Sequence, residues 1–277
     1  MWAFSFATPF IDSLFTNPMS KNWKHAIVIG ASGGIGEALV YELAKQGVSV
    51  GLIARRKDEL ARVASEAQKL LKGTHASDSR PTVKFLTFVH DVTHYSEVPA
   101  LFQEITKQLG GLDLVIYNSG IMPLVAPDEF NFEKDKSIID VNVLGAFAWL
   151  NEAAMRFKNA GSGTIVGISS IAGERGRRGM PAYMTSKAAL TTYLESLRNR
   201  LSQFGVKVVT IKPGVIDTPM SKDSPNKLWL YSPEDAAREI INAAHRGVTV
   251  KYVPWKWRMV SFVLHCLPSF IFRRLNF

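Results

Sequence analysis

Cysteine is almost absent from this sequence: Cys266 is the only one among 277 residues. A single cysteine cannot close an intramolecular disulfide or build a thiolate metal site, so the sequence predicts a reducing, cytoplasmic setting. Histidine is also scarce, and the closest pair, His90 and His94, flanks Asp91 without a zinc-binding spacing. We therefore expect no metal site.

Long hydrophobic runs are missing too, because no uninterrupted apolar stretch reaches the length of about 20 residues that a membrane-spanning helix needs. Residues 1–22 form an apolar N-terminal extension whose start lacks basic residues and contains Pro9 and Asp12. This extension does not resemble a cleaved signal peptide. The sequence predicts a protein that is soluble or peripheral on the cytoplasmic face of a membrane.

Acidic residues are absent from the last part of the chain, since none follows Glu239. Six basic residues do follow it, namely Arg246, Lys251, Lys256, Arg258, Arg273 and Arg274. The formal net charge of +9 is therefore largely a property of this tail. Because the aromatic residues of the tail are interleaved with apolar ones and no recognition motif is present, we expect no nucleic-acid partner.

What the sequence does contain is an alternation of short apolar runs with longer stretches of helical periodicity, which is typical of βαβ units. The predicted strands cover residues 26–29, 48–54, 83–89, 112–117, 164–169 and 206–211, with an edge strand at 248–253. The predicted helices cover residues 34–46, 57–72, 96–109, 132–158, 181–204 and 233–245, and residues 73–81 form a surface loop. The fold class is α/β: a doubly wound parallel sheet (Rossmann fold) in a single domain, residues 23–253, followed by a basic and aromatic C-terminal segment, residues 254–277.

A glycine-rich turn follows the first predicted strand and leads directly into a helix. Its residues are Gly30, Ala31, Ser32, Gly33, Gly34, Ile35 and Gly36. Glycines let backbone N–H groups approach a pyrophosphate closely, and the helix N-terminus adds partial positive charge. Such a turn alone is a weak signal, but its position between strand and helix favours a dinucleotide site.

The end of the second predicted strand indicates which dinucleotide is bound. NAD sites usually carry an acidic residue there, about 20 residues after the turn, which binds the ribose hydroxyls. This sequence has Arg55, Arg56 and Lys57 instead, and a guanidinium can hold a 2′-phosphate through charge-assisted hydrogen bonds. We expect NADP(H), with Arg55 favoured as the phosphate ligand. A solvated basic helix start is the competing interpretation for Arg56 and Lys57.

Tyr183 and Lys187 lie four residues apart in a predicted helix, so their side chains project from one face. A tyrosine hydroxyl has an ordinary pKa of about 10, and an adjacent ammonium lowers that pKa by stabilising the phenolate. The phenol then becomes a usable general acid for carbonyl reduction and a usable base for the reverse reaction. Taken alone, the two residues are an ordinary helix surface pair.

The glycine turn and the Tyr–Lys pair together make the chain resemble the classical short-chain dehydrogenase/reductase family over about residues 23–253. The catalytic serine of such enzymes lies thirteen residues before the tyrosine, which selects Ser170, and their active-site asparagine corresponds to Asn142. The resemblance implies cofactor contacts from Gly30, Ser32, Gly33, Gly34, Ile35, Gly36, Arg55, Arg56, Asp91, Val92, Asn118, Ser119, Gly120, Tyr183, Lys187, Pro213, Gly214, Val215 and Thr218. Two positions depart from the family pattern, Ile29 in place of threonine and Ser119 in place of alanine, and they affect cofactor geometry more than chemistry.

The resemblance also implies a role for each member of the tetrad. Ser170 polarises the substrate oxygen, Tyr183 transfers the proton, Lys187 binds the nicotinamide ribose and tunes Tyr183, and Asn142 completes a proton relay. Homodimers and homotetramers are common in the family, and we expect one of these unless the C-terminal segment blocks the contact.

Two loops are expected near the substrate. The loop between Ser170 and Tyr183 carries Arg175, Arg177 and Arg178, which either attract an anionic substrate or acidic carrier protein, or belong to a solvated loop. The loop 218–231 ends in four apolar and aromatic residues that predict a lid over the substrate.

The C-terminal segment 254–277 combines tryptophans, other apolar residues and cations, a composition that suits a membrane interface. The competing interpretation is a helix packed on the core or in a dimer contact.

The sequence thus predicts an NADP(H)-dependent oxidoreductase acting on a hydrophobic or lipid-like ketone, aldehyde or secondary alcohol. One alternative is a non-catalytic NADP-sensing or scaffold protein whose C-terminal segment binds a membrane or a partner. Another is a sugar-nucleotide epimerase or dehydratase, which also uses Tyr and Lys on one helix but has a different glycine spacing. The complete tetrad favours the oxidoreductase.

Overall fold

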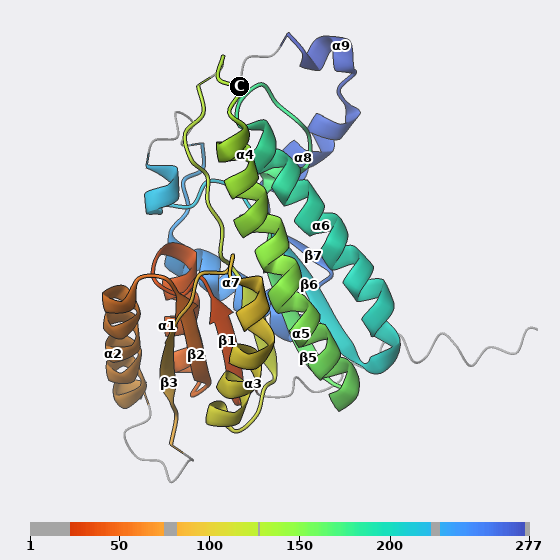
Figure 1. Cartoon of the computed structure of the whole chain (residues 1–277). Helices are drawn as coiled ribbons and strands as arrows, with labels where there is room; N and C mark the ends of the chain where they lie inside the picture. The colour runs from red at the N-terminus through yellow and green to blue at the C-terminus, as the bar shows by residue number, and fades with distance from the viewer. Residues whose placement is uncertain (1–22, 75–81, 127, 223–227, 275–277) are drawn as a thin grey trace, which may run out of the picture.

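The computed structural model describes residues 23–74, 82–126, 128–222 and 228–274. The expected N-terminal extension, residues 1–22, and most of the expected surface loop 73–81 lie outside these ranges. The described chain folds into a single α/β domain in which helices cover both faces of one sheet (Figure 1).

Seven strands form the sheet in the order β3-β2-β1-β4-β5-β6-β7, and every neighbouring pair is parallel. The strands are β1 (His25–Ile29), β2 (Ser49–Ala54), β3 (Phe85–Val89), β4 (Leu114–Tyr117), β5 (Gly163–Ile168), β6 (Val206–Pro213) and β7 (Val250–Val253). The direction of strand addition reverses between β1 and β4. Ligands of open α/β sheets bind at the carboxyl ends of the strands beside such a reversal. The predicted doubly wound sheet, including its seventh edge strand, is confirmed.

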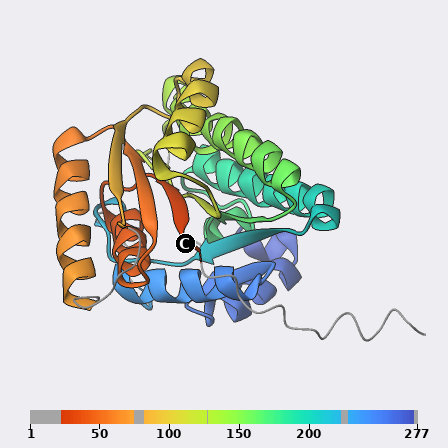
Figure 2. The same cartoon turned by 90° about the horizontal axis from the view of Figure 1, so that it is seen from below.

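Helices pack on both faces of the sheet (Figures 1 and 2). On one face lie α1 (Gly34–Lys45), α2 (Lys57–Thr74) and α7 (Pro233–Arg246). On the other lie α3 (Val98–Leu109), α5 (Gly145–Ala160) and α6 (Pro181–Leu201), with α4 (Phe132–Ile139) leading into α5. Two short helices, α8 (Trp257–Cys266) and α9 (Ser269–Phe272), end the described chain.

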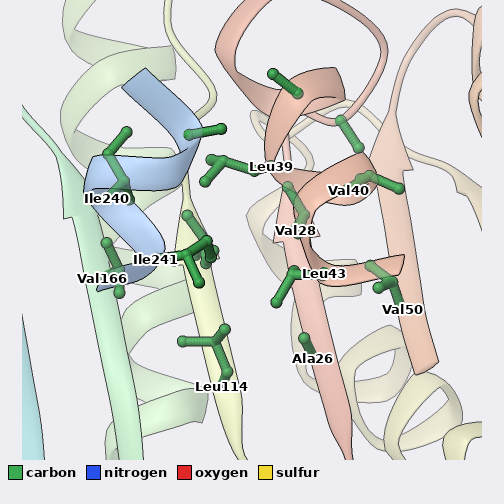
Figure 3. Close-up of a cluster of buried hydrophobic side chains, with 14 of the residues drawn as sticks. Ala26, Val28, Leu39, Val40, Leu43, Val50, Leu114, Val166, Ile240 and Ile241 are labelled. Atoms are coloured by element: carbon green, nitrogen blue, oxygen red, sulfur yellow. The ribbon is translucent and has the colours of Figure 1, made fainter. Parts of the chain in front are cut away.

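The start and end of α7 show how local chemistry sets the helix boundaries. The backbone N–H of Asp235 donates to Ser232 Oγ at 3.0 Å, which satisfies one of the free donors of the first turn. At the other end Gly247 adopts φ 65°, a left-handed conformation that glycine tolerates best. Between these caps Ile240 and Ile241 face the sheet (Figure 3).

The core consists of one large apolar cluster on each face of the sheet and a smaller third cluster, in which Ile138 of α4 packs with Tyr183 and Met184 of α6. In the cluster of Figure 3, Leu39 and Leu43 of α1 meet the α7 isoleucines above Val28 of β1. On the opposite face Trp149 and Phe157 of α5 are completely buried. Because each such side chain contributes about 1.5–3 kcal/mol on burial, the two large clusters make the sheet a rigid support for the loops at its carboxyl edge.

The helix predicted as one piece over residues 132–158 is interrupted. A five-residue π turn, Asp140–Leu144, joins α4 to α5, and the Gly145 N–H bonds to the carbonyl of Asp140. Single π turns inside helices are rare and occur frequently at functional sites. Asn142 lies at the centre of this turn with none of its surface exposed.

Among the described residues, one helix is long and apolar enough to suit a membrane span, the 29 residues Phe132–Ala160. Core helices pass the same criterion, and half of its apolar window is buried inside the fold. Because Trp149 and Phe157 fill the cluster beneath the sheet, we assign this helix to the core.

Candidate active site

A cavity of about 840 Å³ lies at the carboxyl ends of the strands, next to the reversal between β1 and β4. It brings together every residue predicted for the site except Gly36 and Asn142. These two lie directly behind its wall: Gly36 packs against the carbonyl of Gly30, and Asn142 contacts Ile121, which lines the cavity.

The glycine-rich turn is too tightly packed for side chains at two of its positions. A Cβ on Gly30, where φ is 88°, would lie 2.7 Å from the Ser119 nitrogen, and a Cβ on Gly36 would lie 2.0 Å from the Gly30 oxygen. The Asn118 side chain links the ends of β1 and β4, because it donates a hydrogen bond to the Gly30 carbonyl at 3.0 Å. The turn therefore presents bare backbone to the cavity, as a pyrophosphate requires.

The guanidinium that lies on this turn belongs to Arg56. Its Nη2 donates to the Ser32 carbonyl at 2.8 Å and to Ser32 Oγ at 3.1 Å. Arg55 instead points toward Asp91, with 3.5 Å between Nη1 and Oδ2, and its side chain is 64% exposed. Both arginines line the cavity, and the assignment of a 2′-phosphate to Arg55 stays a prediction.

Asp91 and Val92 form the end of the cavity beyond β3. Asp91 accepts hydrogen bonds from the backbone N–H of Thr93 at 3.0 Å and from its hydroxyl at 2.9 Å. Although burial raises the pKa of Asp91, these hydrogen bonds and the charge of Arg55 keep it below its ordinary value. His90, which the sequence analysis considered only as a metal ligand, also lines this end and is buried against Trp149.

The Tyr–Lys pair of α6 is buried, not on the helix surface. Lys187 Nζ donates to the Ile168 carbonyl at 3.0 Å and lies 5.7 Å from the centre of the Tyr183 ring. Burial lowers the pKa of Lys187 to about 8. The ammonium therefore carries an unusual desolvation cost, which oxygen ligands such as ribose hydroxyls relieve.

Ser170 stands beside the tyrosine at the end of β5. Its Oγ accepts the N–H of Ala172 at 3.1 Å and so caps a short 3₁₀ turn. Burial raises the pKa of Tyr183, while a hydrogen bond with Ser170 and the positive charge of Arg177 act in the opposite direction. Arg177, which the sequence analysis did not place beside Tyr183, is therefore a second cation near the phenol, in addition to Lys187.

The side chain of Asn142 is fully engaged in positioning the site. Its Oδ1 accepts the Ile121 N–H at 2.8 Å, and its Nδ2 donates to the Ile121 carbonyl at 3.1 Å and to Ser186 Oγ at 3.0 Å. Ser186 in turn donates to the Tyr183 carbonyl at 2.7 Å. The asparagine thus links the π turn to the catalytic helix, and Ser186, which the sequence analysis missed, completes the link.

The rest of the cavity wall is mainly apolar. Besides Arg175 and Arg177, it includes Met122, Met180, Met220, Leu228, Trp257, Val260 and Leu264. Trp257, Val260 and Leu264 belong to α8, so one face of this helix covers the cavity. This agrees with the competing interpretation of the C-terminal segment, a helix packed on the core. The spacing of these side chains, three and four residues, is the signal in the sequence, because it places them on one side of a helix.

An arginine of the loop before α6 holds α8 in place. Arg175 Nη1 donates to the carbonyls of Leu264 and Leu267, both at 2.5 Å, and these belong to the unpaired carbonyls at the end of α8. Its guanidinium carbon lies 4.0 Å from the centre of the Phe272 ring. The same loop therefore reaches both the active site and the C-terminal helices.

A buried ion pair next to Arg175 adds a second connection between this loop, the sheet and α8. Glu174 and Lys212 are 2.7 Å apart, with only 5% and 11% of their side chains exposed. The Tyr252 hydroxyl donates to Glu174 at 3.0 Å and shares a 3.1 Å hydrogen bond with Ser261 of α8. The network connects β6, β7 and α8 at one point.

Comparison with known proteins agrees with this geometry. The short chain dehydrogenase family model matches residues 24–229. An uncharacterized oxidoreductase of Myxococcus xanthus is 32% identical over 252 residues, which cover 91% of this chain and 95% of that protein. An uncharacterized oxidoreductase of Staphylococcus saprophyticus is 35% identical over 201 residues, which cover 73% and 82%.

Solved structures show the same fold. A short-chain type dehydrogenase/reductase from Mycobacterium marinum superposes with a TM-score of 0.74 at 26% identity, covering 86% of this chain and 97% of the other. A corresponding protein from Mycobacterium ulcerans gives a TM-score of 0.75 at 23% identity, covering 91% and 98%.

A parallel doubly wound sheet with a glycine-rich turn and a buried Tyr–Lys pair at its carboxyl edge is the arrangement of oxidoreductases that use a nicotinamide cofactor, NAD or NADP. The chain belongs to the short-chain dehydrogenase/reductase family.

Proposed function

We propose that this protein is an NADPH-dependent reductase of apolar, lipid-like ketones or aldehydes, and that the same residues serve the reverse oxidation of alcohols. The observation that carries the proposal is one continuous cavity. It extends from the glycine-rich turn and Arg56 to the buried Tyr183 and then to the apolar face of α8. Its direct test is whether the purified protein oxidises NADPH when medium-chain ketones or aldehydes are added.

The protein residues supply the proton and the orientation. The nicotinamide supplies or accepts the hydride when it is bound. Ser170 Oγ and the Tyr183 hydroxyl flank the position of the substrate oxygen, and Tyr183 delivers the proton. Because burial raises the pKa of Tyr183, the phenol is protonated at neutral pH and ready to act as an acid, which favours reduction. Lys187 and the side chain of Asn142 hold the surrounding backbone in register.

The preference for NADPH should depend on Arg56. Replacing it by alanine removes a charge-assisted contact to the 2′-phosphate, so we expect kcat/KM for NADPH to fall about 10- to 100-fold. The value for NADH should hardly change, because that cofactor lacks the phosphate. Steady-state kinetics with both cofactors measure the ratio. Lys57→Ala removes a neighbouring exposed cation and serves as the control; an unchanged NADPH/NADH ratio in Arg56→Ala would contradict the assignment.

We also propose that the protein works at the surface of an anionic membrane. The face of α8 that does not cover the cavity exposes Met259, Phe262 and Val263, and Phe262 is 67% exposed. The same C-terminal segment carries the cations Lys256, Arg258, Arg273 and Arg274, and no acidic residue follows Glu239 in the sequence. A segment that combines an exposed apolar face with cations and no acids is complementary to acyl chains below anionic headgroups. The cavity mouth would then face the source of a lipid-like substrate.

Binding to vesicles tests this orientation. The full chain should co-sediment with vesicles that contain phosphatidylserine and much less with pure phosphatidylcholine, and added salt should weaken binding because it screens the cations. Replacing Phe262 and Val263 by serine should weaken binding by about 100-fold or more, because each apolar side chain buried in the bilayer contributes about 1.5–3 kcal/mol. Met155→Ser, which changes an exposed apolar side chain of α5 far from the C-terminal segment in sequence, is the matched control. Equal binding to neutral and anionic vesicles, or a change of oligomeric state in the Phe262/Val263 variant, would instead indicate another use of this face.

A further inference from the structure

Three arginines follow Ser170 in the loop that leads to α6, and they are used in different ways. Arg175 binds the end of α8, as described above. Arg178 is exposed, and its Nη2 donates to the carbonyl of Arg273 at 2.7 Å. These two guanidiniums therefore fasten the C-terminal helices.

Arg177 lies between them and faces the cavity. Its backbone N–H donates to the sulfur of Met184 at 3.0 Å, which fixes the residue against the start of α6. Its side chain is partly buried and makes neither an ion pair nor a hydrogen bond with any residue that the structure describes. The nearest acidic residue in sequence, Glu174, is already paired with Lys212.

A partly buried guanidinium without an anionic partner is costly, because water solvates it poorly and nothing replaces the lost hydration. Burial accordingly lowers the pKa of Arg177, and the opposing influence comes from Tyr183. The planar fork of a guanidinium matches the oxygens of a carboxylate or a phosphate. An anion entering the cavity beside Tyr183 would satisfy it.

We infer that Arg177 binds an oxyanion of the substrate, and that preferred substrates carry a carboxylate or phosphate near the reacting carbonyl and an apolar chain beyond it. The apolar chain has its place along Met180, Met220, Trp257 and Leu264, which line the same cavity. Arg177 is then a specificity-determining residue. This inference rests on the proposed carbonyl reductase function and names the substrate class for that site.

The test compares matched substrates that differ only in charge. The probes are ten-carbon keto acids with the ketone at the β, γ or δ carbon, their methyl esters, and the corresponding keto-alkyl phosphates. For at least one ketone position we expect the wild-type protein to reduce the acid or the phosphate with a kcat/KM about 10- to 100-fold above that of the neutral ester. Comparing the acid with the phosphate identifies which oxyanion is preferred.

Variants of the loop assign the effect to one side chain. Arg177→Gln should lower the acid-to-ester ratio to about one, and Arg177→Lys should retain part of it because the charge remains. Arg178→Gln removes a neighbouring exposed cation and should leave the ratio unchanged. The ester is an internal control for Tyr183, because any effect of Arg177 on the tyrosine proton would change the rates of acid and ester equally.

Calorimetric titration of the NADP⁺-loaded protein with the same acids and esters gives a readout that does not require turnover. Tighter binding of the acid that is lost in Arg177→Gln supports the oxyanion site even when no reduction occurs, in which case the reductase proposal fails alone. Reduction of acid and ester with equal kcat/KM, together with equal affinities, overturns the role of Arg177 and leaves the reductase proposal intact. An acid preference that survives in Arg177→Gln overturns it as well.

Discussion

Replacing Tyr183 by phenylalanine is expected to lower kcat by about two to four orders of magnitude, the usual contribution of a general acid. The change removes only the hydroxyl, because the ring stays buried beside Ser170 and Lys187. Binding of NADPH should persist, since the turn and Arg56 are untouched. Single-turnover absorbance of bound NADPH measures the chemical step, and fluorescence titration measures cofactor affinity.

Tyr193→Phe is the matched control for this experiment. Tyr193 lies on the same helix, but it does not line the cavity, and its hydroxyl donates to Asn151 of α5 at 2.7 Å. We expect its kcat to equal that of the wild type. A Tyr183→Phe protein that reduces substrate at nearly the wild-type rate would mean that another group delivers the proton.

The second large effect is on stability. Glu174→Gln removes the negative charge of a buried pair and leaves the Lys212 ammonium without a counter-ion, 2.7 Å from a neutral amide. Breaking one side of a buried ion pair costs about 3–5 kcal/mol. For a chain of this length that cost should lower Tm by roughly 5 to 10 °C, which calorimetry or circular dichroism can measure.

Two further variants make the stability result specific. Glu66→Gln breaks an exposed pair with Lys69 at the same 2.7 Å distance and should cost less than about 1 kcal/mol. Adding Lys212→Met to Glu174→Gln removes the orphaned charge and should recover most of the loss. If Glu174→Gln and Glu66→Gln lowered Tm equally, the buried network would not be what fastens α8 to the sheet.

The parts of the site that the sequence predicted are those fixed by local spacing. The strand–turn–helix unit at Gly30 follows from three glycines at set intervals. Glycine is needed because Gly30 lies against the backbone of Ser119 and Gly36 lies against the carbonyl of Gly30, which leaves no room for a side chain. The Tyr183–Lys187 pair follows from one helical turn. In both cases the residues that act together are close in sequence, so local secondary structure is enough to set their relative geometry.

The parts that the sequence left open depend on contacts between distant segments. Arg55 and Arg56 are adjacent in the chain, and only the packing of the turn decides that Arg56 lies over Ser32. The π turn around Asn142 has no signature in hydrophobic periodicity, since α4 and α5 keep one apolar face through it. The placement of α8 over the cavity depends on Arg175, which lies 89 residues away from Leu264.

The central claim is that one cavity holds NADPH and an apolar carbonyl compound for proton transfer from Tyr183. The measurement that tests it most directly is the rate of cofactor oxidation by the purified full chain with NADPH and with NADH, over a panel of medium-chain ketones, aldehydes and keto acids. We expect turnover with NADPH that greatly exceeds turnover with NADH and is lost in Tyr183→Phe. Tight NADPH binding without turnover on any member of the panel would contradict the claim and indicate a protein that senses the cofactor without using it.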